Sequence, residues 1–304
     1  MIYTRKDNGT IRIKADGIDL TISSDKVDME IDGYVVEPTK VDVKPLLPYQ
    51  WQQTAPFNSQ LPVFENFDSV QAPTGCTQIA LAMVAAYYGN IGVGGKKYPK
   101  GCDKTAEYVS KKGTAYEKTI PALPATTFDY AAFNLAKPED FKTDKAKEAV
   151  GKFLKYICYS DHTSFGVSAS SCSLSRALSE TINKRMHLAN KAVLIEAKDD
   201  METFKERVYE ELRQGNPVLM GTSGTKTASD GTKSVMGHTF VCDGYRASDD
   251  TYHFYIGFPS SAFNRWYKME NAVLSWQGTT WDWTHNTGGE VAMQAIVNLH
   301  PYEV

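Results

Sequence analysis

The sequence predicts an α+β protein, and three observations support that fold class. Near the N-terminus, apolar and polar residues alternate over short stretches, which is typical of half-buried strands. Between residues 74 and 215, apolar residues recur at the spacing of one helix face. Over 217–299, short strand-like segments alternate with turn residues, as in an antiparallel sheet. Helices therefore come first and a sheet follows, in two unlike halves.

The N-terminal stretch 10–36 is expected to form two β-hairpins. Its alternation is interrupted by Asp-Gly pairs that begin at Asp16 and Asp32, and Asp-Gly between alternating segments is a strong hairpin signal. Three prolines follow within a short span, which favours a boundary there. We therefore assign residues 1–44 to an N-terminal β-hairpin segment and residues 45–304 to the main domain.

Three helices are predicted from the spacing of apolar residues. The first runs from Thr74, a suitable N-cap, to Gly89, a suitable stop. One of its faces is apolar and carries Ile79, Ala82, Met83 and Ala86. The second helix is expected within 143–159 and the third within 201–215, each with one apolar face.

The C-terminal half is predicted to be a sheet, because short turn-rich intervals between strands favour antiparallel pairing. Its strand-like segments are 217–223, 238–245, 251–258, 265–273 and 293–299. The intervening segment 224–237 is polar, and we expect it to be a mobile linker. The tryptophans of this half are expected to form core or a cleft wall; they are Trp266, Trp276, Trp281 and Trp283.

Composition limits the possible functions. The chain has 304 residues, 42% hydrophobic and 23% charged, with a net charge of −3. This is ordinary globular composition and gives no reason to expect nucleic acid or an anionic membrane as partner. No apolar run approaches the roughly 18 residues of a membrane span, and the N-terminus lacks the apolar core of a signal peptide. Five cysteines and six histidines are scattered without CxxC or HExxH motifs, so we expect no metal site and no cofactor.

Cys76 has the position of a nucleophile at the start of the first predicted helix. The free N–H groups and the dipole of a helix N-terminus favour a thiolate, and Gly75 allows another backbone or a substrate to approach closely. The alternative is a small buried residue that begins a core helix. His238 follows 162 residues later, where a predicted strand begins, and is the best candidate for the base. The other cysteines are expected to be inert.

Three motifs occur in the order of one known family. Thr74-Gly75-Cys76 precedes a helix of small apolar residues, residues 237–244 read Gly-His-Thr-Phe-Val-Cys-Asp-Gly, and residues 45–58 contain Pro-Leu-Leu and Trp-Gln-Gln-Thr-Ala-Pro-Phe-Asn. They resemble the Thr-Gly-Cys, Gly-His-Ala-Phe-Val-x-Asp-Gly and Trp-x-Gln-x-x-Pro-Tyr-Asn patterns of the streptopain family of papain-like cysteine peptidases. Further likenesses extend the match over residues 45–301.

This resemblance implies a papain-like two-lobed fold, with an N-terminal helical lobe and a C-terminal antiparallel β-sheet lobe. In the roles that it implies, Cys76 attacks the peptide carbonyl, His238 transfers the proton, and Gln53 donates its side-chain N–H to the oxyanion. Members of the family are secreted, so we expect a secreted, cell-surface or periplasmic protein with protein or peptide substrates. A pro-segment or a protein inhibitor is a further expected partner, and residues 1–44 are expected to be a pro-remnant or an appendage.

One part of the family pattern is missing. The family reads His-x-Asn-Trp-Gly-Trp-Gly-Gly, in which the Asn orients the catalytic imidazole and the Trp shields it, but here Tyr255 and Ile256 take those places. Three readings follow: a Cys-His dyad without a third member, an orienting group from elsewhere, or loss of activity.

The sequence thus predicts a cysteine endopeptidase, a hydrolase of peptide bonds. The alternatives are a catalytically impaired relative that binds peptides or proteins in the same cleft, and a Cys-His amidase or acyltransferase.

Overall fold

The structure is a computed structural model of the chain. It describes residues 2–5, 11–15, 18–22, 27–31, 34–36, 40–64, 68–90, 97–98, 105–109, 115–119, 126–186, 188–198, 200–258 and 261–301. The chain divides into two compact units, residues 1–42 and residues 43–304.

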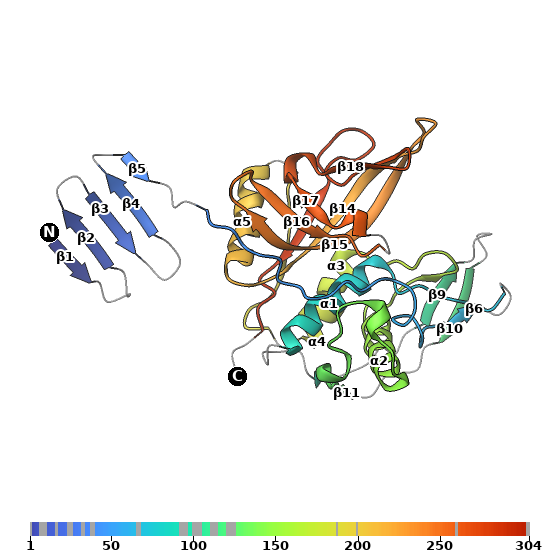
Figure 1. Ribbon diagram of the computed structural model, residues 1–304. Coiled ribbons are helices and arrows are strands. Elements are labelled where there is room, and N and C mark those ends of the chain that lie inside the picture. The colour runs from blue at the N-terminus through green and yellow to red at the C-terminus, as the bar shows by residue number, and fades with distance from the viewer. Residues whose placement is uncertain are drawn as a thin grey trace. The chain divides into compact units, whose positions relative to one another are not determined.

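The first unit is a five-stranded antiparallel sheet in which each strand pairs with the next along the chain (Figure 1). Its strands are β1 (Ile2–Arg5), β2 (Ile11–Ala15), β3 (Ile18–Ile22), β4 (Val27–Ile31) and β5 (Tyr34–Val36). Ala15 pairs with Ile18, and Ile31 pairs with Tyr34. These registers confirm the two predicted hairpins, whose Asp-Gly connections themselves lie outside the described residues.

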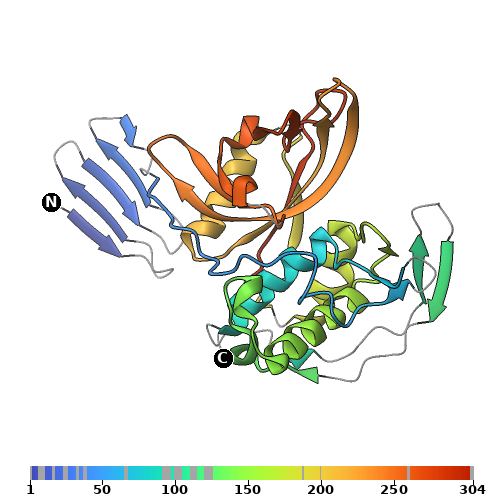
Figure 2. The same cartoon turned by 45° about the vertical axis from the view of Figure 1, so that its right-hand side comes forward.

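The helical lobe of the second unit is built around two long helices, as Figures 1 and 2 show. α1 spans Cys76–Asn90 and α2 spans Asp144–Ser160. Its short helical elements are η1 (Tyr130–Phe133), η2 (Pro138–Asp140), α3 (Leu174–Ala177), η3 (Leu178–Ile182) and α4 (Asn183–Arg185). Its short strands are β6 (Val63–Phe64), β7 (Val70–Gln71), β8 (Lys97–Tyr98), β9 (Thr105–Val109), β10 (Ala115–Thr119), β11 (Thr126–Thr127) and β12 (Phe165–Gly166).

Helix α1 is buried on every side and not along one stripe. Leu81 and Ala85, which lie off the predicted apolar face, are as fully buried as the residues on it, so α1 is a central core helix. The predicted helix ends are wrong by about one residue. The helix continues through Gly89, where a Cβ would lie 2.5 Å from the Tyr130 ring, so the glycine provides space for packing. At the other end, the carbonyl that accepts the first helical hydrogen bond belongs to Gly75. Gly75, and not Thr74, is therefore the residue that caps the helix.

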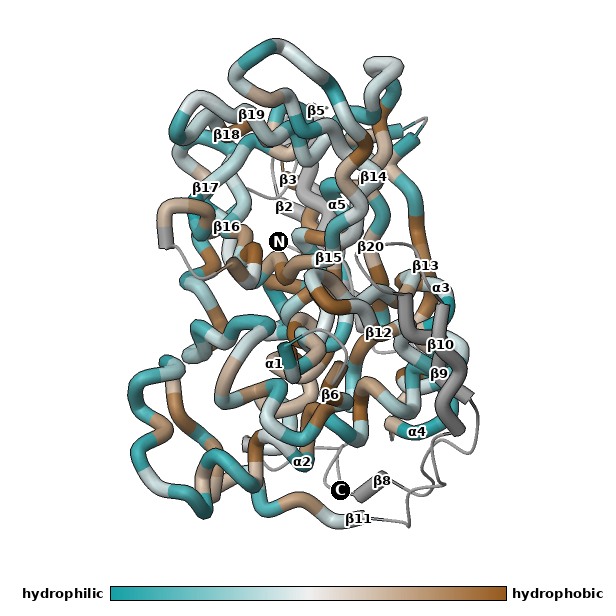
Figure 3. The backbone as a smooth tube through the Cα atoms, turned by 90° about the vertical axis from the view of Figure 1, so that its right-hand side faces the viewer, coloured by the Kyte–Doolittle hydropathy of each residue, from teal (hydrophilic) through white to brown (hydrophobic). Residues whose placement is uncertain are grey.

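The sheet lobe is antiparallel, with the strand order β13-β20-β14-β15-β16-β17; β19 pairs with β14, and β18 pairs with β19. The strands are β13 (Val193–Glu196), β14 (Val218–Thr227), β15 (Lys233–Arg246), β16 (Thr251–Tyr255), β17 (Arg265–Tyr267), β18 (Val273–Trp276), β19 (Thr279–Asp282) and β20 (Met293–Val297). Short 3-10 turns also occur in this lobe, η4 (Ser261–Phe263) and η5 (Met269–Asn271). The third predicted helix, α5 (Met201–Arg213), packs on this sheet through Phe204, Val208 and Leu212. Hydrophobic segments run through both lobes (Figure 3). The predicted α+β fold with a helical lobe and an antiparallel sheet lobe is confirmed.

The segment 224–237 belongs to this sheet, and the expectation of a mobile linker is wrong. β14 and β15 stay paired out to Thr227 and Lys233, and a tight turn follows in which Gly231 has φ 85°. The far end of β14 also pairs with β19. Backbone pairing holds these polar residues in place, and composition does not reveal such pairing. The predicted strand 265–273 is likewise divided, into β17, a 3-10 turn and the start of β18.

Candidate active site

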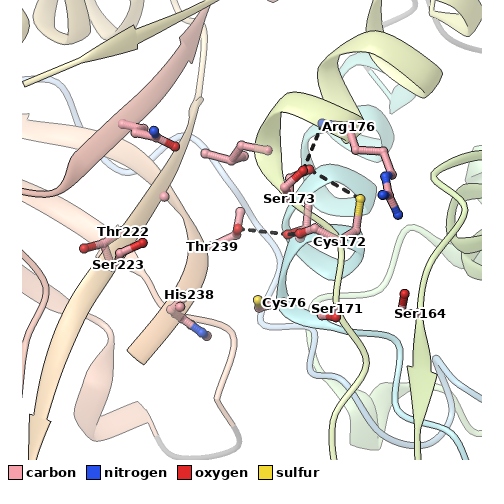
Figure 4. A pocket seen from close by; sticks show the side chains of 15 residues that line it. Cys76, Ser164, Ser171, Cys172, Ser173, Arg176, Thr222, Ser223, His238 and Thr239 are labelled. Carbon is pink, nitrogen blue, oxygen red and sulfur yellow. Dashed lines mark hydrogen bonds between the residues drawn. The ribbon is translucent and has the colours of Figure 1, made fainter. Parts of the chain in front are cut away.

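Cys76 is the first residue of α1 and lines a cavity between the two lobes (Figure 4). The preceding Gly75 has φ 92°, a left-handed conformation that glycine adopts without strain. A Cβ on Gly75 would also lie 2.8 Å from the Ser170 carbonyl oxygen. Glycine is therefore needed for the sharp entry into α1, and this entry leaves the thiol at the helix N-terminus.

His238 lies on β15 and faces Cys76 from the sheet lobe (Figure 4). A buried hydrogen bond connects the two lobes next to Cys76 and His238. It joins Thr77 Oγ1 and Thr239 Oγ1, which are 2.9 Å apart. Thr77 Oγ1 also donates to the Cys172 carbonyl oxygen at 2.7 Å, so Thr239 is the donor in the bond between the threonines. This bridge holds the thiol and the imidazole beside one another.

The far nitrogen of the imidazole is held by a backbone carbonyl. His238 Nε2 lies 2.7 Å from the Ile256 carbonyl oxygen. A carbonyl oxygen can only accept, so Nε2 must carry the hydrogen in the neutral ring. The tautomer is therefore fixed, and Nδ1 is left with a lone pair for the proton of Cys76. An orienting group does exist, and it comes from the main chain.

Tyr255, which replaces the family's Asn, does not contact the imidazole. Its hydroxyl donates to the Trp51 carbonyl oxygen at 3.1 Å. The neighbouring Ile256 is instead fixed by its own N–H, which donates to Asn264 Oδ1 at 3.0 Å. Asn264 therefore positions the carbonyl that orients His238. Sequence reasoning missed Asn264, because it lies outside the matched motifs and a role exerted through a backbone carbonyl leaves no side-chain signature.

Aromatic rings shield the imidazole from the side of the sheet lobe. The Trp283 and Phe258 ring centroids lie 5.5 Å and 4.7 Å from that of His238. Trp283 is completely buried. It shields the His238 imidazole, which the Trp of the family pattern would otherwise shield. The expectation that the tryptophans form core or a cleft wall holds for Trp283.

The environment of Cys76 favours its thiolate. Burial alone would raise the pKa of the thiol, but the hydrogen bond and the positive charge of His238 lower it. A hydrogen bond from the Thr239 backbone lowers it further, and the resulting pKa of Cys76 is about 7. Near neutral pH, a large fraction of the protein thus carries a thiolate at this position.

The cavity beside the pair has a volume of about 480 Å³. Its helical-lobe wall includes Ser171, Cys172, Ser173 and Arg176, and its other wall is formed by β14 and β15. The loop 165–173, whose packing could not be derived from sequence, therefore contributes to the cleft. A cavity of this size accommodates a side chain of a bound peptide.

The main chain of Gln53 lies beside the segment that leads into Cys76. Its carbonyl oxygen accepts from the Thr74 N–H at 3.0 Å, two residues before Cys76. It is half-buried and is not among the residues that line the cavity. Its assignment to the oxyanion hole stays a prediction.

The remaining titratable candidates have structural surroundings. Burial raises the pKa of the thiols of Cys158, Cys172 and Cys242, which supports their predicted inertness; Cys102 lies outside the described residues. His253 pairs with Asp243, with 2.6 Å between Nδ1 and Oδ1. In the described part of the chain, no group of acidic, His or Cys side chains is arranged to hold a metal ion.

The family model described as the Peptidase C10 family matches residues 51–267. The chain belongs to this family. The thiol protease/hemagglutinin PrtT of Porphyromonas gingivalis is 26% identical over 230 residues, 72% of this chain and 23% of that protein. The chain thus spans about a quarter of the length of that relative.

Two solved structures of Prevotella intermedia proteins share the C10 fold of this chain. The active wild-type interpain A cysteine protease has a TM-score of 0.64 at 20% identity, covering 88% of this chain and all of that one. A mutant prointerpain A fragment has a TM-score of 0.60 at 16% identity and covers 99% of this chain and 98% of that one.

Membership of the C10 family confirms the predicted streptopain-type resemblance. It also confirms the predicted enzyme class, a cysteine-type peptidase and hence a hydrolase. Among the described residues, no helix is both long enough and apolar enough to span a membrane.

Proposed function

We propose that this chain is a cysteine endopeptidase in which Cys76 is the nucleophile and His238 the general base and acid. The observation that carries the proposal is the fixed tautomer of His238, with Nε2 donating to Ile256 and Nδ1 available to the thiol. The family's Asn is absent, but its orienting function is present. The hypothesis of a catalytically impaired relative rested on that absence and loses its support.

The proposed reaction proceeds through an acyl-enzyme. His238 Nδ1 holds the proton of Cys76, and the thiolate attacks the carbonyl carbon of the peptide bond. The imidazolium then gives this proton to the leaving amine as the C–N bond breaks, which leaves a thioester on Cys76. Water, deprotonated by the same nitrogen, hydrolyses the thioester and restores the thiol. The backbone N–H of Cys76 and the side-chain amide of Gln53 are the proposed donors to the oxyanion in both steps.

Substitution of the nucleophile tests this proposal. Cys76→Ala should abolish cleavage of an unfolded protein substrate, and an epoxysuccinyl inhibitor should label wild type at Cys76 alone. Gln53→Ala should retain labelling but lose about 100- to 1,000-fold in kcat, the usual effect of removing one oxyanion donor. Equal cleavage by wild type and Cys76→Ala would contradict the proposal.

We also propose that the substrates are proteins or peptides outside the cytoplasm, and that the N-terminal segment 1–44 is a pro-remnant or an appendage. The match to the prointerpain A fragment over nearly the whole chain supports a pro-form relationship. Fractionation of producing cells tests the location. Activity recovered only from the cytoplasm would contradict it.

A further inference from the structure

The cavity beside Cys76 has an unusual electrostatic character for a protein whose net charge is −3. Apart from the Cys76–His238 pair, the only ionisable side chains among its described lining residues are Cys172 and Arg176, and none of those lining residues is Asp or Glu. Most of the remaining wall carries hydroxyl groups, among them Ser164, Ser171 and Ser173. The wall is therefore polar and positively charged, with many donors for an anionic group.

The local fold places Arg176 on this wall. Ser173 caps the short helix α3, since its Oγ accepts from the Arg176 N–H at 3.2 Å. Leu174 is buried and packs against the sheet lobe at Gly221, where a Cβ would lie only 2.3 Å from its Cδ1. These two contacts fix α3 against the cavity. Figure 4 shows the guanidinium on the helical side, beyond Cys172 as seen from His238.

The guanidinium has donors to spare. Its one hydrogen bond within the described structure runs from Nη1 to the His162 carbonyl oxygen at 3.4 Å, and a guanidinium carries five N–H groups. The nearest acidic side chain along the chain, Glu180, is paired with Lys184 at 2.9 Å. Cys172 does not compete as an anion, because burial raises its pKa. Arg176 is thus a cation in a cleft wall that lacks a carboxylate.

We propose that Arg176 makes this peptidase prefer substrates with a Glu or Asp side chain near the scissile bond. The inference rests on the proposed endopeptidase function, whose reacting atoms lie in the same cavity. The substrate carboxylate binds the guanidinium through charge-assisted hydrogen bonds, which are bidentate in the best geometry. Seryl hydroxyls donate to its remaining lone pairs. The preference is for the anion, so Gln, which has the shape of Glu without its charge, is the matched comparison.

Paired peptide libraries test the preference on the full chain. Peptides that carry Glu or Gln at each position flanking the cleavage site are compared by kcat/KM. Wild type should favour Glu about 5- to 10-fold at one position, less at high salt because the guanidinium is exposed. Arg176→Gln should abolish the ratio, and Arg176→Glu should favour Lys instead. Lys191→Gln, which removes an exposed positive charge outside the cavity, should leave the ratio unchanged.

A binding measurement separates this inference from the proposed function. Fluorescence anisotropy of the same peptides on Cys76→Ala requires no turnover. If no peptide is cleaved but Glu peptides still bind more tightly, and Arg176→Gln removes the difference, the subsite stands and the peptidase proposal fails. Equal kcat/KM and equal affinity for Glu and Gln peptides at every position would overturn the inference, as would a ratio that persists in Arg176→Gln.

Discussion

The thiol of Cys76 and the imidazole of His238 should act as one ionising unit. Because the pKa of Cys76 is about 7, its thiolate is populated above that pH and disappears below it. An unperturbed thiol needs a pH about 1.5 units higher for the same thiolate fraction. We expect alkylation of Cys76 by iodoacetamide, followed by mass spectrometry, to rise with pH around a midpoint near 7. In His238→Ala the midpoint should move to higher pH, because burial still raises the pKa of Cys76 and the imidazole that lowered it is gone.

Cys172 provides the internal control for this experiment. It lines the same cavity, but burial raises the pKa of its thiol. It should therefore label far more slowly than Cys76 at neutral pH. Equal labelling of the two thiols would show that proximity to the cavity, and not His238, determines reactivity.

Asn264 should matter for catalysis although it touches neither the thiol nor the imidazole. Its Oδ1 fixes the Ile256 N–H, and the Ile256 carbonyl fixes His238. Asn264→Leu keeps the side-chain size but removes the acceptor, so we expect kcat to fall about 10- to 100-fold with little change in KM, as a misplaced catalytic group causes. Asn264→Asp retains the acceptor and should recover most of the loss. A change confined to thermal stability, with kcat intact, would make Asn264 merely structural.

At the scale of elements, the sequence predicted what depends on local chemistry. Cys76 and His238 became candidates through local patterns, a cysteine at a predicted helix start and a histidine at a predicted strand start. The strand start was wrong, because β15 begins at Lys233 and His238 lies within it. The Ile256 carbonyl was not predictable, because every residue has one and only the fold decides its direction. The hairpin 224–237 was missed for a related reason. Its polar residues are held in strands by backbone pairing with neighbouring strands, and local sequence does not reveal those partners.

The junction of α1 and α2 contains a buried acid that should make stability depend on pH. Asp161, just after α2, is fully buried and accepts from Gln78 Nε2 at 3.2 Å and from the Thr181 hydroxyl. Burial outweighs these bonds and raises its pKa to about 7. Between about pH 4 and pH 7 the folded state therefore holds a proton that the unfolded state has lost, and the free energy of unfolding falls as pH rises.

Asp161→Asn should remove this dependence while keeping the acceptor for Thr181. We expect the free energy of unfolding of Asn relative to Asp to increase by roughly 4 kcal/mol between about pH 4 and about pH 8, as measured by urea denaturation. Asp144→Asn, at the exposed start of the same helix, should show no such increase. Parallel pH profiles for wild type and Asp161→Asn would contradict the buried-acid account.

At the scale of the whole molecule, the start of the second unit is secured by its own hydrogen bonds to β15. Val43 and Tyr245 exchange two backbone hydrogen bonds, of 2.7 and 2.8 Å. The N–H groups of Leu46 and Leu47 donate to the main chain and to the carboxylate of Asp243, at 2.9 and 3.0 Å. The segment 43–47 is thus part of the peptidase unit, and a truncation should respect it.

Two fragments test this boundary and the role of the N-terminal unit together. The fragment 43–304 keeps all of these bonds and should melt within a few degrees of the full chain, whereas 48–304 loses about four hydrogen bonds. Each such bond contributes about 1 kcal/mol, so 48–304 should melt roughly 5–10 °C lower by calorimetry.

If residues 1–42 act on the cleft, 43–304 should also cleave peptides faster than the full chain. Equal rates for the two would make the N-terminal unit an appendage, and equal melting of the two fragments would show that the segment 43–47 does not stabilise the fold.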